Sequence, residues 1–121
     1  MAFNDDSMGG LGDYIKMQQL YDETEQLIDE LRQHEYEAAE HEANYRTLIT
    51  TKTAELRMNN VPVTIIGGLV KGEPDVVQAF LAMEKAKANA KADSHLIFLR
   101  KDQMGMIAEL IKHDWYRPSN G

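Results

Sequence analysis

Three histidines are the residues of this chain whose type and spacing best suit chemistry. His34 and His41 are seven positions apart, so both fall on one face of a helix. If the chain folds back on itself at its middle, His95 comes opposite them, with Glu37 and Glu42 beside the group. Imidazole and carboxylate groups that converge inside a helical bundle are typical of metal sites. His34, His41 and His95 therefore form a candidate metal site.

The same histidines have a simpler interpretation that requires no metal. Their spacing does not reproduce the Glu-x-x-His pairs of carboxylate di-metal proteins, and the sequence has no His-Glu-x-x-His zinc motif. A polar residue in an apolar helical seam sets the register of the partner helix, and a histidine there can make the seam sensitive to pH. We therefore predict no cofactor and keep metal binding and pH sensitivity as alternatives.

A row of carboxylates is the second candidate site. Residues 21–42 contain nine acidic residues and a single basic one, Arg32. A rod with this charge can imitate a nucleic-acid backbone and occupy a basic cleft, whereas the simpler interpretation is a solvated helix face. The predicted partner-binding face consists of Glu23, Glu25, Asp29, Glu30 and Glu37.

The rest of the sequence contains no catalytic motif. Gly67-Gly68 is not followed by Lys-Ser or Lys-Thr, so it does not form a phosphate-binding loop. The chain has no cysteine, which excludes disulfides and thiolate metal sites. We therefore predict that the protein is not an enzyme, and we assign no catalytic residue.

Two long helices are the elements that would position these residues. From Asp13, which suits an N-cap, to Asn60 the chain contains neither Gly nor Pro. A helix over this stretch would be roughly 70 Å long. Apolar and small residues recur in alternating steps of four and three, the heptad spacing of a coiled coil. This seam consists of Leu20, Thr24, Leu27, Leu31, His34, Ala38, His41, Tyr45 and Leu48.

A compact elbow follows the first long helix. Asn59-Asn60 closes that helix because Asn tolerates the left-handed conformation of a C-cap, and Pro62 prevents its continuation. We expect Thr64 to cap a short helix over residues 65–70, whose four apolar side chains cover the end of the helix pair. Gly72 then ends the short helix.

The last helix is expected to start at Glu73-Pro74-Asp75 and to run to about Trp115, because Pro is permitted in a first helical turn. Folding at the elbow brings Glu42 near Lys91 or, one turn away, near Lys87. Such charge pairs fix an antiparallel register more than they add stability.

Four consecutive apolar residues in the last helix argue for a partner. They are Leu96, Ile97, Phe98 and Leu99. Together they cover nearly the whole circumference of the helix, and a single partner helix cannot bury all of them. The alternatives are a kink or a folded-back N-terminal tail. The predicted fold is all-α, a long antiparallel two-helix hairpin with a short helix at the elbow, and residues 96–99 form its oligomer interface.

Length and composition fit one small domain. The chain has 121 residues, and we expect a hairpin domain over residues 13–116, an elbow at 60–74 and flexible tails at 1–12 and 117–121. The net charge of −7 argues against a general binder of duplex DNA, so nucleic acid is not the favoured partner. No apolar run approaches the ~20 residues of a membrane span, and the first residues do not resemble a signal peptide, which favours the cytoplasm.

Several segments together resemble small helical-hairpin proteins of tailed bacteriophages and prophages. They are Tyr45-Arg46, Pro62-Val63-Thr64-Ile65-Ile66, Leu69-Val70-Lys71-Gly72, an acidic stretch and Trp115. Those phage proteins tend to be encoded near replication and recombination genes, and most have no assigned activity. The resemblance covers most of residues 45–115, and it implies a helical hairpin in the cytoplasm of the host cell without implying any functional residue.

These observations favour a non-enzymatic accessory protein that acts through protein contacts in or upon DNA metabolism. Its expected partners are further copies of itself and another protein, and no membrane is involved. The first alternative is an inhibitor of a host defence nuclease that uses the acidic helix as a nucleic-acid mimic. The second alternative is a helical bundle that binds metal through His and Glu.

Overall fold

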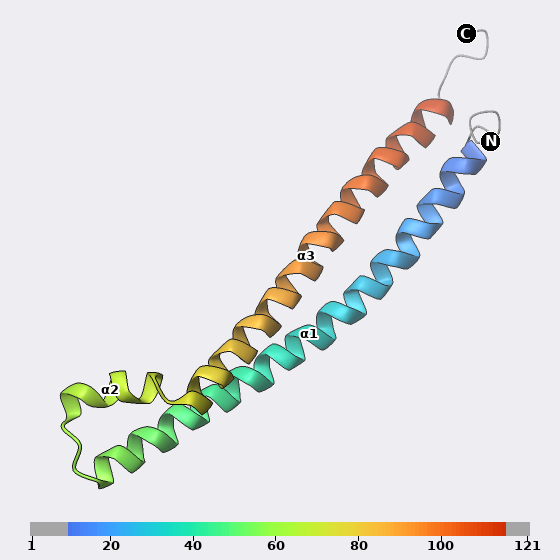
Figure 1. Cartoon of the computed structure of the whole chain (residues 1–121). Helices are drawn as coiled ribbons and strands as arrows, with labels where there is room; N and C mark the ends of the chain where they lie inside the picture. The colour runs from blue at the N-terminus through green and yellow to red at the C-terminus, as the bar shows by residue number, and fades with distance from the viewer. Residues whose placement is uncertain (1–9, 116–121) are drawn as a thin grey trace. The chain divides into compact units, whose positions relative to one another are not determined.

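Three α-helices account for nearly all of residues 10–115, the part of the chain that the structure, a computed structural model, describes (Figure 1). Helix α1 spans Gly10–Met58, α2 spans Val63–Lys71 and α3 spans Pro74–Trp115. These residues contain no β-strand, and the two long helices pack together, so the prediction of an all-α fold with a short helix at the elbow is confirmed.

The chain groups into two compact units, each of which contains part of both long helices. The elbow unit, residues 31–92, holds the second half of α1, all of α2 and the start of α3. Among the described residues, the terminal unit comprises 10–30 and 93–115 and holds the start of α1 and the end of α3. In the elbow unit, contacts from Glu42 to Lys87 and from Lys52 to Asp75 show that α1 and α3 run antiparallel.

The end of α1 follows the sequence prediction closely. The helix stops at Met58, and Asn60 has a positive φ of 61°, the left-handed conformation that Asn tolerates best after Gly. The N–H of Val61 then donates to the carbonyl of Leu56 at 3.1 Å, which satisfies one of the last carbonyls of the helix. Pro62 follows and prevents a return to α1.

Helix α2 begins earlier than the sequence predicts. It starts at Val63 after Pro62, with no side-chain cap, so Thr64 lies inside the helix and its predicted capping role is wrong. The physical reason is the fixed backbone of Pro62, whose carbonyl accepts the first-turn N–H of Ile65 at 3.1 Å. The helix ends at Gly72, as predicted, whose N–H donates to the carbonyls of Gly68 and Leu69 at 3.2 Å each.

A small apolar core holds the elbow unit together. Ile66 and Val70 from α2 meet Val76 from α3, and all three are buried. The partly buried side chains packed around them are Tyr45, Leu48, Ile49, Leu56 and Val61. Only one face of α2 enters this core, because residues four apart share a face, so Ile65 and Leu69 stay exposed and the expected plug of four apolar side chains is reduced to two.

The start of α3 agrees with the expected use of Pro at the first turn. The helix begins at Pro74, and the N–H of Val77 donates to the carbonyl of Glu73 at 2.9 Å. The carboxylate of Asp75 accepts the N–H of Val76 at 3.0 Å. A carboxylate at this end also complements the positive end of the helix dipole.

The start of α1 departs from the prediction. The helix begins at Gly10 and Asp13 lies in its first turn, so Asp13 is not the N-cap and the last residues of the predicted tail, 10–12, are helical. The first N–H groups of a helix have no intrahelical partner, so glycines cost less there than in a helix interior. The rest of the predicted tails, residues 1–9 and 117–121, lies outside the described residues.

Both long helices bury a stripe with a heptad repeat. All nine predicted seam positions of α1, from Leu20 to Leu48, are buried or half-buried, which confirms that seam. Helix α3 has a matching stripe that the sequence analysis did not predict. Its members are Val76, Ala79, Met83, Ala86, Ala90, Asp93, Ile97, Arg100, Met104, Ile107 and Ile111. Steps of three and four on both helices are typical of knobs-into-holes packing.

The core of the elbow unit predicts a large effect for a small change in α2. Val70→Ala removes buried methyl groups and should lower the free energy of unfolding by about 2 kcal/mol. Val63→Ala, in the same helix at a side chain that is 70% exposed, should change it by less than about 0.5 kcal/mol. Urea denaturation followed by circular dichroism measures both, and equal effects would contradict the packing of α2.

Candidate interaction surfaces

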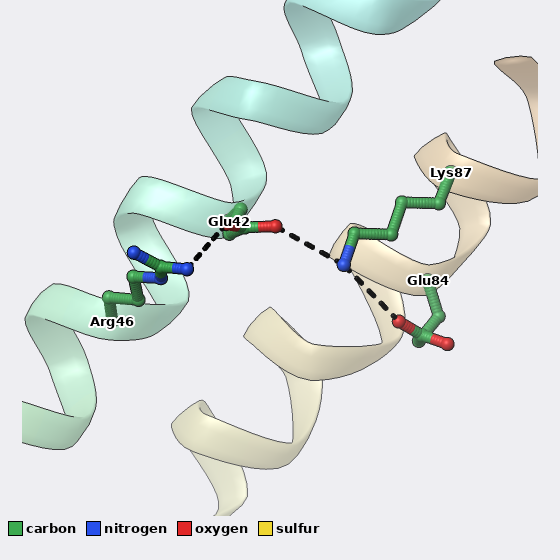
Figure 2. Close-up of polar contacts among 4 residues, drawn as sticks. All are labelled: Glu42, Arg46, Glu84 and Lys87. Atoms are coloured by element: carbon green, nitrogen blue, oxygen red, sulfur yellow. Dashed lines mark ion pairs between the residues drawn. The ribbon is translucent and has the colours of Figure 1, made fainter.

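An ion-pair network joins α1 to α3 in the elbow unit (Figure 2). A carboxylate oxygen of Glu42 lies 2.9 Å from a guanidinium nitrogen of Arg46, and its other oxygen lies 3.2 Å from the Lys87 amine. Glu84 lies 4.0 Å from the same amine. The sequence analysis expected either Lys87 or Lys91 near Glu42, and in the structure Lys87 makes the ion pair. All four side chains are partly solvated, so the network fixes register more than it adds stability.

A second ion pair links the helices closer to the elbow. The amine of Lys52 lies 3.4 Å from a carboxylate oxygen of Asp75. The hydrogen bond from Lys52 to Asp75 and the negative charge of that carboxylate raise the pKa of Lys52 above its ordinary value. Glu55 and Glu73 raise the same pKa by smaller amounts. A raised pKa stabilises the fold below the ordinary lysine pKa, and this contribution is lost as pH rises through the folded pKa.

Asp75 raises the pKa of Lys52 more than Glu73 does, so replacing the two residues should lower that pKa by different amounts. Asp75→Asn should return the pKa toward its ordinary value, because it removes the main negative charge and leaves only a neutral hydrogen-bond acceptor. Glu73→Gln should lower it by a smaller amount. Carbon-13 NMR titration of the lysine ε-methylene measures both changes, and a larger shift for Glu73→Gln would contradict the assignment.

Polar side chains interrupt the seam of the terminal unit. The hydroxyl of buried Thr24 donates to the carbonyl of Leu20 at 2.7 Å, and Asp93 is buried in the facing stripe. The Nε of Arg100 is covered and finds no hydrogen-bond acceptor among the described residues. Glu23 lies 4.0 Å from that Nε, which allows attraction between the charges but is too long for a hydrogen bond.

Sequence reasoning missed Asp93 and Arg100 as seam residues. A signal was present, because steps of three and four counted from Val76 reach both positions. It was obscured because neither residue is apolar, and because alanines occupy several positions before them. Arg100 also donates through Nη1 to the side-chain oxygen of Gln103 at 3.0 Å, so its polar end is directed along the surface of α3.

The predicted acidic face is only partly free. Glu25, Asp29 and Glu30 are exposed, whereas Glu37 is half-buried. Glu23 is exposed and lies beside Arg100. The carboxylates best placed to meet another molecule are therefore those of Glu25 and Glu30, on the part of α1 that belongs to the terminal unit.

The three histidines do not assemble into a site. His34 and His41 are half-buried members of the α1 seam, and His95 is exposed on α3. Among residues 10–115, no three His, Asp or Glu side chains are placed to hold a metal ion. Two helical turns separate His34 from His41, roughly 10 Å, whereas ligands that share an ion approach it to about 2 Å. The structure therefore gives no support to a metal site at His34, His41 and His95.

The four predicted interface residues divide between two environments. Ile97 is half-buried in the α3 seam and packs within the chain, so it is not available to a partner. Leu96, Phe98 and Leu99 are exposed. The sequence argument that one helix cannot cover all four residues is consistent with this division.

An apolar groove of about 350 Å³ lies beside the core of the elbow unit. It is lined by Tyr45, Lys71, Val76, Val77, Phe80 and Leu81. The rings of Tyr45 and Phe80 are 5.6 Å apart between centroids and tilted by 58°, a favourable aromatic contact that forms one wall. Four of the six lining residues are apolar, so the groove offers a surface for contact with another apolar group.

No protein-family model, curated protein or solved structure matches this chain. Within the part that the structure describes, no helix combines the length and apolar character that crossing a membrane requires.

Proposed function

We propose that this protein is a non-enzymatic accessory protein that acts through protein contacts and associates with itself through α3. The observation that supports this proposal is the exposure of Leu96, Phe98 and Leu99 on a helix whose opposite face already packs in the seam. Apolar side chains gathered on one segment favour burial against another molecule. The resemblance of residues 45–115 to phage hairpin proteins is the reason for assigning the role to DNA metabolism in a host cytoplasm.

Self-association through apolar residues should not depend on salt. Light scattering at micromolar concentration should show a dimer or larger assembly at both low and high ionic strength, since salt does not screen apolar burial. Leu99→Glu should weaken the association at least tenfold, because it places a charge in the contact. Ser94→Glu, which adds the same charge at another exposed position of α3, should leave it unchanged. A monomer at both salts would contradict self-association.

The exposed carboxylates of α1 favour a second candidate function, inhibition of a host defence nuclease. Between residues 10 and 30 the chain has six acidic residues and one basic residue. Glu25 and Glu30 are exposed there, as a mimic of a nucleic-acid backbone requires. The nucleic-acid channel of an RNA-guided nuclease is positively charged and is the kind of surface that such a face fits.

Charge reversal tests this second candidate. The protein should slow DNA cleavage by an RNA-guided nuclease at low salt, and the inhibition should fall steeply as salt rises. Combining Glu25→Lys with Glu30→Lys should reduce inhibition at least tenfold. The matched control combines Asp102→Lys with Glu109→Lys, which reverses two exposed charges on α3. Equal inhibition by the α1 variant and the unmodified protein would eliminate the candidate.

A further inference from the structure

Helix α3 carries a second apolar stripe in the terminal unit, separate from the seam that faces α1. Its apolar members are Leu96, Leu99, Met106 and Leu110, which are 38%, 50%, 69% and 56% exposed. Gln103, also exposed, is the polar member at the middle. The steps between the five positions are three, four, three and four, the same heptad spacing as the buried seam. Phe98 lies off this stripe, although it is exposed.

This spacing restricts the kind of partner that fits. A stripe that repeats every 3.5 residues stays in line only against another helix with the same repeat, whose side chains enter the holes between its own. A flat protein surface would leave the spaces between the apolar side chains unfilled. The occupant of the stripe is therefore a helix.

Both α1 and α3 of a second copy have an exposed apolar stripe at heptad spacing, and their charges decide which of them is the better partner. In the terminal unit, α1 also has exposed apolar residues at heptad spacing, namely Leu11, Tyr14, Tyr21 and Ile28. Residues 10–30 nevertheless carry six acidic residues and one basic residue, so two copies of this segment repel each other. Residues 93–114 of α3 carry four acidic and three basic residues, which makes contact between two copies of α3 the least repulsive arrangement.

We propose that α3 stripes from two copies of this chain pack against each other, antiparallel, across a two-fold axis near Gln103. This inference rests on the proposed self-association and specifies its surface as Leu96, Leu99, Met106 and Leu110. Ile97 and Phe98 are excluded from the contact. An isologous contact of one stripe with itself closes as a dimer and leaves no open end.

The antiparallel direction follows from the dipoles of the paired helices. In a parallel pairing the like ends of the two α3 helices lie side by side, which is repulsive, whereas an antiparallel pairing places opposite ends together, which is favourable. Centred on Gln103, the antiparallel pairing brings Leu96 of one copy to the level of Leu110 on the other.

Single cysteines test the arrangement directly, because the chain contains none of its own. In Gln103→Cys the two thiols meet at the two-fold axis, within the short distance that a disulfide requires. The substitution also removes the exposed hydrogen bond that Arg100 donates to the side chain of Gln103. Lys101→Cys, exposed on α3 outside the stripe, and Gln18→Cys, exposed on α1 between Tyr14 and Tyr21, are the matched controls.

Mild oxidation at micromolar concentration should cross-link Gln103→Cys at least tenfold faster than either control, as judged on a non-reducing gel. An oligomer by light scattering in which Gln103→Cys reacts no faster than Lys101→Cys would overturn the α3 contact but leave self-association intact. Faster cross-linking of Gln18→Cys would overturn it in favour of α1. Rapid cross-linking of Leu99→Cys to itself would overturn the antiparallel direction, because residues 99 of two antiparallel copies lie about 12 Å apart along the helix axis. A monomer that cross-links at no position would overturn both this inference and the proposed self-association.

Discussion

The internal seam between α1 and α3 is the constraint on which the other features of this protein depend. Each long helix buries one stripe at heptad spacing, and two helices packed as a pair have only one seam between them. Any apolar residue outside that stripe stays at the surface, even when the seam is well packed. The exposed Leu96, Phe98 and Leu99 are therefore a consequence of a two-helix architecture, which leaves each helix with uncovered sides.

The polar residues of the seam lower the stability of the helix pair, but they favour one alignment of the two helices. Thr24, Asp93 and Arg100 occupy positions that Leu would fill with more buried apolar area. A charged residue in a seam is tolerated in few registers, because most alternatives leave it without an opposite charge. Glu23 supplies the opposite charge near Arg100, and in the elbow unit Glu42 pairs with Lys87, which lies outside the seam. Charge pairs therefore favour one alignment within each unit.

The sequence predicted those parts of the fold that depend on neighbouring residues, namely the end of α1 and the heptad repeat along it. Asn60 in its left-handed conformation and Pro62 together end α1, and the α1 seam contains enough Leu to reveal its period. The α3 seam was not predicted, because alanines and the polar Asp93 and Arg100 occupy several of its positions, which hides the apolar repeat. The Thr64 cap failed because Pro62 had already fixed the backbone two residues earlier.

The candidate site was predicted less well, because a site depends on distances between elements and not on residue types alone. His34 and His41 share a face of α1, yet the rise of a helix keeps them too far apart for a common ion. The predicted acidic face and the predicted apolar interface required only that their side chains be exposed, and not that they converge. Most of their residues therefore remain candidates for contact with a partner. A surface of this kind can be recognised from the residue types in a segment, whereas a site made of converging side chains can be recognised only once the fold is known.

The two remaining surfaces differ in how they respond to solution conditions, and this difference has functional meaning. The proposed contact through Leu96 and Leu99 would exclude water from apolar area, and its free energy would change little with ionic strength. The proposed contact through Glu25 and Glu30 would be electrostatic and would weaken as salt screens the charges. A protein with both surfaces can stay assembled while its attachment to a basic partner forms and dissolves. Such separable contacts are one means by which a helix pair can act on another macromolecule.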